Sequence, residues 1–214
     1  MKYFLPLFLF LSITGCITLP KNLRTPDSAE SAVIGVSIRT VTLRIFKNRQ
    51  NVVYFVKLDG PEEGVIGSRV FPANFVKGDH AYLVNARPGR YVAVASVFFQ
   101  SENSYNSFFD RETIQSTAVD AGPGDFIFMG SLSVGNHLKS LYQNIERHGD
   151  REQLHYYNLL KPVMYGTFYT GSLLNMDRSP GAERSFLVVA RDHFKDSDWL
   201  PHIGKRAEAL EKDR

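Results

Sequence analysis

Cys16 is the only cysteine in the 214 residues and the side chain with the most distinctive chemistry. Gly15 precedes it directly, and an apolar stretch from Tyr3 to Ile13 follows Lys2. This is the layout of a secretory signal, since about eleven apolar residues span only ~16 Å as a helix, far less than the ~30 Å core of a bilayer. A lone cysteine in an exported chain has no partner for an internal disulfide, which leaves a free thiol or a modified one.

The residues around this cysteine resemble the lipobox of bacterial lipoprotein precursors, which is an aliphatic residue, a small residue, Gly or Ala, and then Cys. The matching residues are Ile13-Thr14-Gly15-Cys16. The resemblance implies that residues 1–15 are removed and that Cys16 carries a diacylglycerol thioether and an amide-linked third acyl chain. At ~0.8 kcal/mol per buried methylene, two or more chains anchor a protein stably. In the alternative, an ordinary signal is cleaved elsewhere and Cys16 is unmodified.

The residue after the lipobox cysteine bears on the destination of a lipoprotein. This residue is Ile17 rather than Asp. In a host with two membranes, the resemblance therefore implies transport to the outer membrane.

Two histidines with acidic neighbours could form a metal site. His148 and His155 are seven residues apart, with Asp150 and Glu152 between them, so they would share one face of a continuous helix. Such a site would support a hydrolase that acts on cell-wall or lipid material. Gly149 favours a break in that helix, and solvated histidines are the alternative.

No other reaction signature is present in the sequence. It contains no His-Glu-x-x-His motif, no Gly-x-Ser-x-Gly nucleophile elbow and no phosphate-binding loop with its lysine. With Cys16 acylated, no thiol nucleophile remains. The sequence therefore predicts a protein that is not an enzyme and uses no cofactor.

The charge balance argues against a nucleic-acid partner. The chain has 25 Lys and Arg residues against 22 Asp and Glu residues, a net charge of +3, and the two signs are interspersed. Nucleic-acid binding is typical of a basic stripe or patch, which this pattern lacks. Residues 16–214 are enough for one hydrophobic core.

A stretch rich in serine and asparagine, 100–111, contains three aromatic residues. Aromatics among Ser and Asn are typical of recognition surfaces. Five aromatic residues are therefore predicted to contact a partner: Tyr105, Phe108, Phe109, Tyr156 and Tyr157. In the alternative, the aromatics of this stretch fold back and cover one end of the domain.

Alternating apolar residues and turn signals predict a mainly β fold. Two apolar runs on either side of Pro88-Gly89 predict a hairpin over 81–99, because glycine adopts the positive φ of a type II turn. The other predicted strands are 33–46, 52–58, 65–71, 113–119, 126–134, 163–174 and 185–190.

The domain organisation follows from these elements. Residues 16–32 show no apolar period and are predicted to be a lipidated tether, whose disordered length would reach roughly 20 Å. In the alternative, part of this tether packs on the domain. The domain 33–214 is predicted to contain a helical insertion at about 136–180 and a C-terminal helix at about 197–212, with apolar residues three and four positions apart.

The region 34–134 resembles the small β-sandwich domains of uncharacterised envelope lipoproteins. The matching residues are Pro88-Gly89-Arg90-Tyr91 and Phe126-Ile127-Phe128-Met129-Gly130. The resemblance implies an antiparallel β-sandwich, Ig-like or transthyretin-like, and no catalytic residues.

The sequence thus predicts a non-enzymatic envelope lipoprotein. It would be held at the membrane through lipid on Cys16 and would bind another envelope protein or a cell-wall polymer. Two alternatives stay open. One is a hydrolase with a site at His148, Asp150 and His155, and the other is a surface lipoprotein that contacts host molecules.

Overall fold

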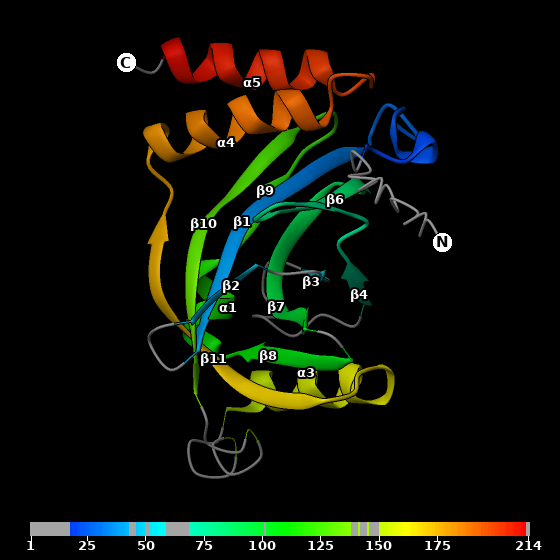
Figure 1. The fold of residues 1–214 in the computed structure, drawn as a ribbon. Coiled ribbons are helices and arrows are strands. Elements are labelled where there is room, and N and C mark those ends of the chain that lie inside the picture. Colours follow the sequence, from blue (N-terminus) through cyan, green and yellow to red (C-terminus); the bar gives the residue numbers. More distant parts are fainter. Residues whose placement is uncertain are drawn as a thin grey trace, which may run out of the picture.

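The computed structural model describes residues 18–42, 46–49, 52–58, 69–100, 102–137, 141, 145 and 150–212. These residues form one 11-stranded mixed sheet that curls into a half-barrel (Figure 1). The strands are β1 (Ala32–Thr42), β2 (Phe46–Arg49), β3 (Val52–Leu58), β4 (Arg69–Pro72), β5 (Phe75–Lys77), β6 (His80–Ala86), β7 (Gly89–Gln100), β8 (Asn103–Phe109), β9 (Val119–Ala121), β10 (Phe126–His137) and β11 (Thr167–Asp177). The predicted mainly β class is confirmed.

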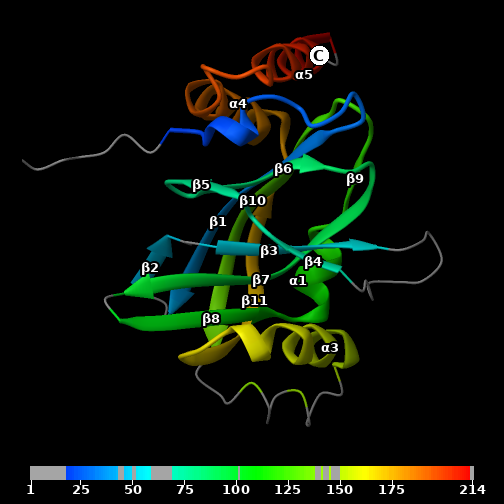
Figure 2. The same ribbon diagram turned by 90° about the vertical axis from the view of Figure 1, so that its right-hand side faces the viewer.

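The helices lie on the outside and at the ends of this sheet. In Figures 1 and 2, α4 and α5 lie together at one end of the molecule and α3 lies at the opposite end, next to β8. The helical elements are η1 (Lys21–Leu23), α1 (Arg111–Ser116), α3 (Arg151–Leu160), η2 (Lys161–Val163), α4 (Pro180–His193) and α5 (Leu200–Lys212). None of the helices in the described part of the chain is long and apolar enough to cross a membrane.

The curl of the sheet follows from its strand order, β4-β3-β7-β8-β11-β10-β1-β6-β5. The two end strands of this path, β4 and β5, are neighbours in sequence, with only Ala73 and Asn74 between them. Such a link spans no more than about 11 Å even when fully extended. A flat sheet of this order would hold β4 and β5 several strand spacings apart, so the sheet must bring its two edges together.

The side chain of Asn74 bonds the β4–β5 link to β6. Its Nδ2 donates to the carbonyl oxygen of Val84 at 2.8 Å, and its Oδ1 accepts from the Val84 amide nitrogen at 2.8 Å. The preceding amide, that of Ala73, donates to the carbonyl of Val53 in β3 at 2.7 Å. The link therefore bonds to β3 on one side and to β6 on the other. We call the line along which the β3–β4 edge and the β5–β6 edge of the sheet meet the seam.

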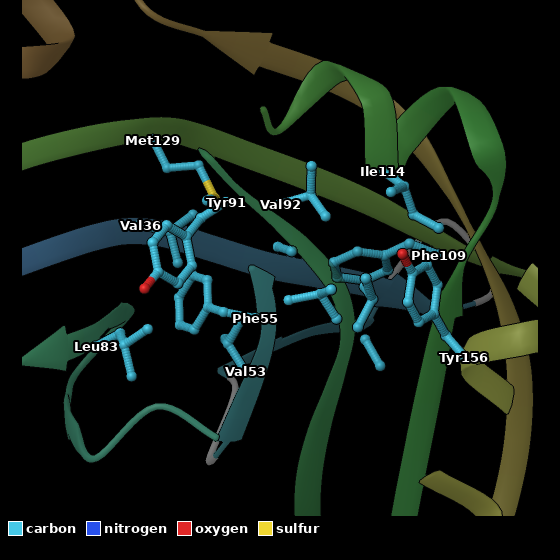
Figure 3. Packing of buried hydrophobic residues seen from close by; sticks show 14 of the residues in the cluster. Val36, Val53, Phe55, Leu83, Tyr91, Val92, Phe109, Ile114, Met129 and Tyr156 are labelled. Carbon is cyan, nitrogen blue, oxygen red and sulfur yellow. The ribbon is translucent and has the colours of Figure 1, made fainter. Parts of the chain in front are cut away.

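The larger hydrophobic core fills the concave face of the sheet. Residues from strands at both ends of the path meet in one cluster, which is possible only inside the curl. Figure 3 shows Phe55 and Tyr91 packed together near Leu83, with Phe109 and Ile114 at the far end of the same cluster. All five side chains are buried.

A second core lies on the convex face, under α4 and α5. Alternate residues of β1, β6 and β10 face this side, as Tyr82 does in β6. Ser179 caps α4 by accepting from the Ala182 amide, and Trp199 is fully buried between the helices and the start of the described chain. Arg206 of α5 donates from two nitrogens to the nearly buried carboxylate of Glu183 in α4, at 2.6 and 3.0 Å.

The predicted antiparallel β-sandwich is wrong in its architecture. The structure has one curled sheet instead of two packed sheets, and two of its pairings are parallel, β1 with β10 and β8 with β11. The hairpin predicted over 81–99 is also wrong, because β6 pairs with β1 and β5 whereas β7 pairs with β3, β8 and β9. The chain crosses the seam between these strands, although Gly89 has the predicted positive φ, 146°.

The segment 136–180, predicted as a helical insertion, contains the helix α3 but is not an insertion into the sheet. It contains β11, which lies between β8 and β10 in the middle of the path. The strand predicted over 185–190 lies inside α4, where the buried Phe186, Leu187 and Ala190 share one helix face. The strand predicted over 113–119 is mostly the helix α1, capped by Asp110. The C-terminal helix is observed as α5.

The described part of the predicted tether packs on the domain. Leu19 and Leu23 are only 4% and 7% exposed and join the second core beside α5. Arg24 donates from Nε to the carbonyl of Leu19 at 3.2 Å, which holds the turn of η1 together. Residues 19–24 therefore agree with the alternative expectation, in which part of 16–32 packs on the domain.

Replacing Asn74 with alanine is expected to destabilise the fold by about 1–2 kcal/mol, since the two hydrogen bonds that fix the β4–β5 link to β6 are lost and the Val84 backbone is left without them. Urea denaturation followed by circular dichroism measures the change. The matched control is Asn175→Ala, at an exposed residue of β11, which should shift stability by less than about 0.5 kcal/mol. Equal effects of the two substitutions would show that the side chain of Asn74 does not hold the edges together.

Candidate functional site

A pocket with a volume of about 500 Å³ opens at the seam of the half-barrel. Its walls come from β3 and β4 on one side and from β6 on the other, with the chain between β6 and β7 at its edge. These strands face the viewer in Figure 2. The pocket exists because the two edges meet through the β4–β5 link without pairing along the rest of their length.

Three cations line this pocket: Lys57, Arg69 and Arg87. Arg69 and Arg87 are exposed, and Lys57 is half-buried. No carboxylate is among the described residues that line the pocket, and no ion pair is observed for these three cations within the described part of the chain. The segment 59–68, with its acidic residues, lies outside the described residues.

Gly89 leaves room for the side chain of Lys57. A Cβ at this position would come within 2.3 Å of Lys57 Cε and 3.1 Å of its Nζ. The positive φ of Gly89 is also one that residues with side chains rarely adopt. Glycine in the turn therefore lets the ammonium group lie across the backbone at the pocket.

The floor of the pocket is apolar and its chemistry is that of an anion site. Phe71, Leu83 and Tyr91 line the pocket together with the three cations and contribute carbon surface to its wall. The Tyr91 hydroxyl donates to the carbonyl of Arg87 at 2.8 Å, and burial raises the pKa of this phenol, so Tyr91 stays neutral. Cations around an apolar floor favour a carboxylate or phosphate group that is attached to a less polar body.

The five aromatic residues predicted as partner contacts are not displayed together. Phe108, Phe109 and Tyr156 are fully buried, so predicting them as contacts was wrong; the two phenylalanines belong to the larger core itself. Most of the stretch forms β8, which is paired with β7 on one side and β11 on the other. Residues 103–109 are therefore part of the sheet and do not form a projecting loop.

Tyr105 and Tyr157 are half-buried and packed against other rings. Tyr105 stacks on Phe98 with a centroid separation of 4.6 Å, and Tyr157 meets Phe108 edge-on at 5.3 Å. Lys161 Nζ lies over the Tyr157 ring, 5.3 Å from its centroid. Both tyrosines thus have packing roles in the described structure.

The residues of the predicted metal site are only partly described. His148 lies outside the described residues, as does Cys16 of the predicted lipidation site. Asp150 is engaged by backbone: it caps α3 by accepting from the Gln153 amide at 3.0 Å, and it accepts from the Arg111 amide at 2.9 Å. Within the described residues no group of three His, Cys, Asp or Glu side chains could hold a metal ion.

The buried His193 and the half-buried His80 form a cluster with the buried Tyr82 between the sheet and α4. His193 Nδ1 lies 2.9 Å from the Tyr82 hydroxyl, and the His80 ring lies 5.6 Å from the His193 ring. Burial lowers the pKa of His193 to about 4 and also lowers the pKa of His80. The neutral His193 ring can accept the Tyr82 proton, so this cluster stabilises the packing of α4 on the sheet.

The sequence did not predict that the three pocket cations lie together, because they are far apart in the chain. Lys57, Arg69 and Arg87 stand in three separate stretches with no motif between them. The single local signal is Pro88-Gly89, which predicted the turn but not its position beside Lys57. Only the seam brings the three residues together.

Comparisons of the chain with models of protein families, with curated proteins and with solved structures found no significant match.

The buried histidines predict a loss of stability at mildly acidic pH. Between pH about 6.5 and about 4, the unfolded chain binds a proton at His193 that the folded chain excludes, so the free energy of unfolding falls as the pH falls through this range. The urea midpoint, measured at several pH values, should decrease accordingly.

The control for this prediction is His193→Asn, which keeps a hydrogen-bond acceptor for Tyr82 but does not titrate. Its midpoint should depend less on pH, with the remaining slope due to His80 and to the nearby Asp192, which is paired with Lys77. An unchanged slope in this variant would contradict the assignment.

Proposed function

We propose that this chain is a non-enzymatic lipoprotein of the cell envelope that binds an anionic group of an envelope partner in the seam pocket. Lipid on Cys16 anchors it, and in a host with two membranes the anchor lies in the outer one. The partner is another envelope protein or a cell-wall polymer that carries a carboxylate or a phosphate. The observation that carries the binding assignment is the set of three cations around an apolar-floored pocket with no described carboxylate in its wall.

The build of the pocket supports binding better than catalysis. Its polar side chains are Lys57, Arg69, Arg87 and Asn85, together with the neutral Tyr91. This set offers donors and positive charge, and it includes no histidine, carboxylate, serine or cysteine among the described residues. An acidic group that enters the pocket would gain charge-assisted hydrogen bonds from these cations.

The lipid anchor is proposed from the signal and lipobox pattern. Ligand binding in the seam pocket does not depend on the anchor, because the described walls of the pocket come from the sheet and from the connection between β6 and β7. The anchor instead places the pocket in the envelope, where acidic polymers and partner proteins are concentrated at a surface.

The anchor predicts incorporation of labelled palmitate into the wild-type chain and its loss in Cys16→Ser. Without acyl chains the protein should move from the detergent phase to the aqueous phase, since two or more chains are required for stable anchoring. Mass spectrometry of the N-terminal peptide measures the modification directly. An unmodified peptide that begins at another residue would contradict the proposal.

The pocket predicts that single neutralising substitutions weaken anion binding. Loss of one charge-assisted hydrogen bond, worth roughly 1.5 kcal/mol, lowers affinity about tenfold. Titration with inorganic phosphate, followed through the backbone amide signals of Arg87, Gly89 and Tyr91, should therefore give about tenfold weaker binding for Lys57→Gln.

The matched control for this titration is Arg184→Gln, a cation of α4 away from the pocket, which should bind phosphate like the wild type. In cells, a photo-crosslinking residue at Arg87 should capture an envelope component, and the same residue at the exposed Val188 of α4 should not. Equal loss of phosphate binding in both neutralised variants, or equal capture from both positions, would exclude the seam pocket as the binding site.

A further inference from the structure

The start of the described chain is fixed to the domain by apolar contacts. Leu19 and Leu23 lie in the second core together with Trp199 and residues of α5. Both leucines are at least nine-tenths buried, and Trp199 is completely buried. Residues 19–23 are therefore part of the folded domain and cannot act as a free tether.

Hydrogen bonds fix the same segment from the other side. Trp199 Nε1 donates to the carbonyl of Leu23 at 3.1 Å, and the Asp198 amide donates to the carbonyl of Arg24 at 2.8 Å. Two backbone carbonyls of the segment thus bond to the short connection between α4 and α5. This connection and the start of the described chain form one surface.

The fixed position of Leu19 limits how far the domain can stand from the membrane. Only Ile17 and Thr18 separate Leu19 from Cys16, and the three Cα–Cα steps from Cys16 to Leu19 reach no more than about 11 Å when fully extended. A free tether of the full length 16–32 would reach roughly 20 Å and would allow many orientations. A lipid on Cys16 therefore holds the domain by one point close to its surface.

We infer that the surface formed by residues 18–24 and the α4–α5 connection lies against the bilayer, and that the α3 end of the molecule points away from it. The inference rests on the proposed lipidation of Cys16. The partner of this surface is the lipid bilayer, because the acyl chains on Cys16 must enter the hydrocarbon while Cys16 stays within about 11 Å of Leu19. Figures 1 and 2 place α3 at the end opposite α4 and α5, so the half-barrel stands between the membrane and α3.

The orientation has a consequence for the seam pocket. The pocket lies between the two ends of the molecule, on strands β3, β4 and β6 (Figure 2). With the α4–α5 connection at the bilayer, the pocket opens sideways, along the membrane plane. Its ligand is therefore reached from the side and not from the lipid.

The test uses the full lipidated chain in vesicles of phosphatidylethanolamine and phosphatidylglycerol. Because Cys16 is acylated, a cysteine introduced elsewhere is the only thiol that a fluorophore can label. One probe site is Lys195→Cys, an exposed residue whose pocket also contains Thr18 and Leu19. The other is Val163→Cys, 73% exposed, the last residue of η2, which follows α3. Lipids with a spin label should quench the fluorophore at 195 and leave the one at 163 as bright as in vesicles without spin label.

A linker variant separates the short anchor from other causes. A flexible Gly-Ser insertion of about 20 residues after Ile17 adds roughly 25 Å of reach. It should keep the protein on the vesicles but abolish the quenching at 195. Persistent quenching in this variant, or equal quenching at 163 and 195 in the parent chain, would overturn the inferred orientation.

Failure of the anchor is detected independently of orientation. Flotation of the unlabelled protein with the vesicles, and the mass of its N-terminal peptide, report lipidation alone. A protein that is acylated and floats but shows equal quenching at both sites would contradict the orientation while leaving the proposed anchor intact. Matching circular dichroism spectra of all variants establish that each one is folded.

Discussion

The shape of this molecule depends on one covalent constraint, the two-residue link between β4 and β5. These strands end the hydrogen-bonded path at opposite edges, yet Ala73 and Asn74 are all that separates them. The sheet can satisfy this link only by curling until its edges meet, and the curl creates the concave face that the larger core fills. The amide side chain of Asn74 makes both hydrogen bonds to the Val84 backbone of β6 that a neighbouring strand would otherwise make. It thereby fixes the link to β6 beyond the end of the β5–β6 pairing.

The seam that this link leaves is also where the polar chemistry gathers. Outside the seam pocket, the strand cations Arg39 and Lys77 are each paired with a carboxylate, Asp79 and Asp192 respectively. At the seam the edges approach without a continuous ladder, and Lys57, Arg69 and Arg87 surround a pocket over an apolar floor. Gly89 is needed at this point for two reasons, its positive φ and the close approach of Lys57. The same closure that builds the core thus leaves the site that can bind an anion.

The outer layer has a different task. The α4–α5 pair buries the convex face, and it also binds the segment that enters the domain from the predicted anchor. This pairing joins the two ends of the described chain in one core, with His193 held neutral beneath it by burial. With the proposed anchor on Cys16, this packed entry segment would hold the seam pocket close to a membrane and open to the side.

The sequence by itself determined what depends on neighbouring residues. It predicted the mainly β class, the C-terminal helix α5 and the positive φ of Gly89, because apolar periodicity and turn chemistry are local. It also predicts the signal and lipobox, whose meaning is carried by sixteen consecutive residues. Only the tertiary structure decided which strands pair, and β6 and β7 separate across the seam although a Pro-Gly turn connects them. It likewise placed Phe108, Phe109 and Tyr156 in the core, turned 185–190 into helix, and gathered the three pocket cations from distant stretches. The physical reason is that strand pairing and burial depend on contacts between residues far apart in the chain, which local pattern does not encode.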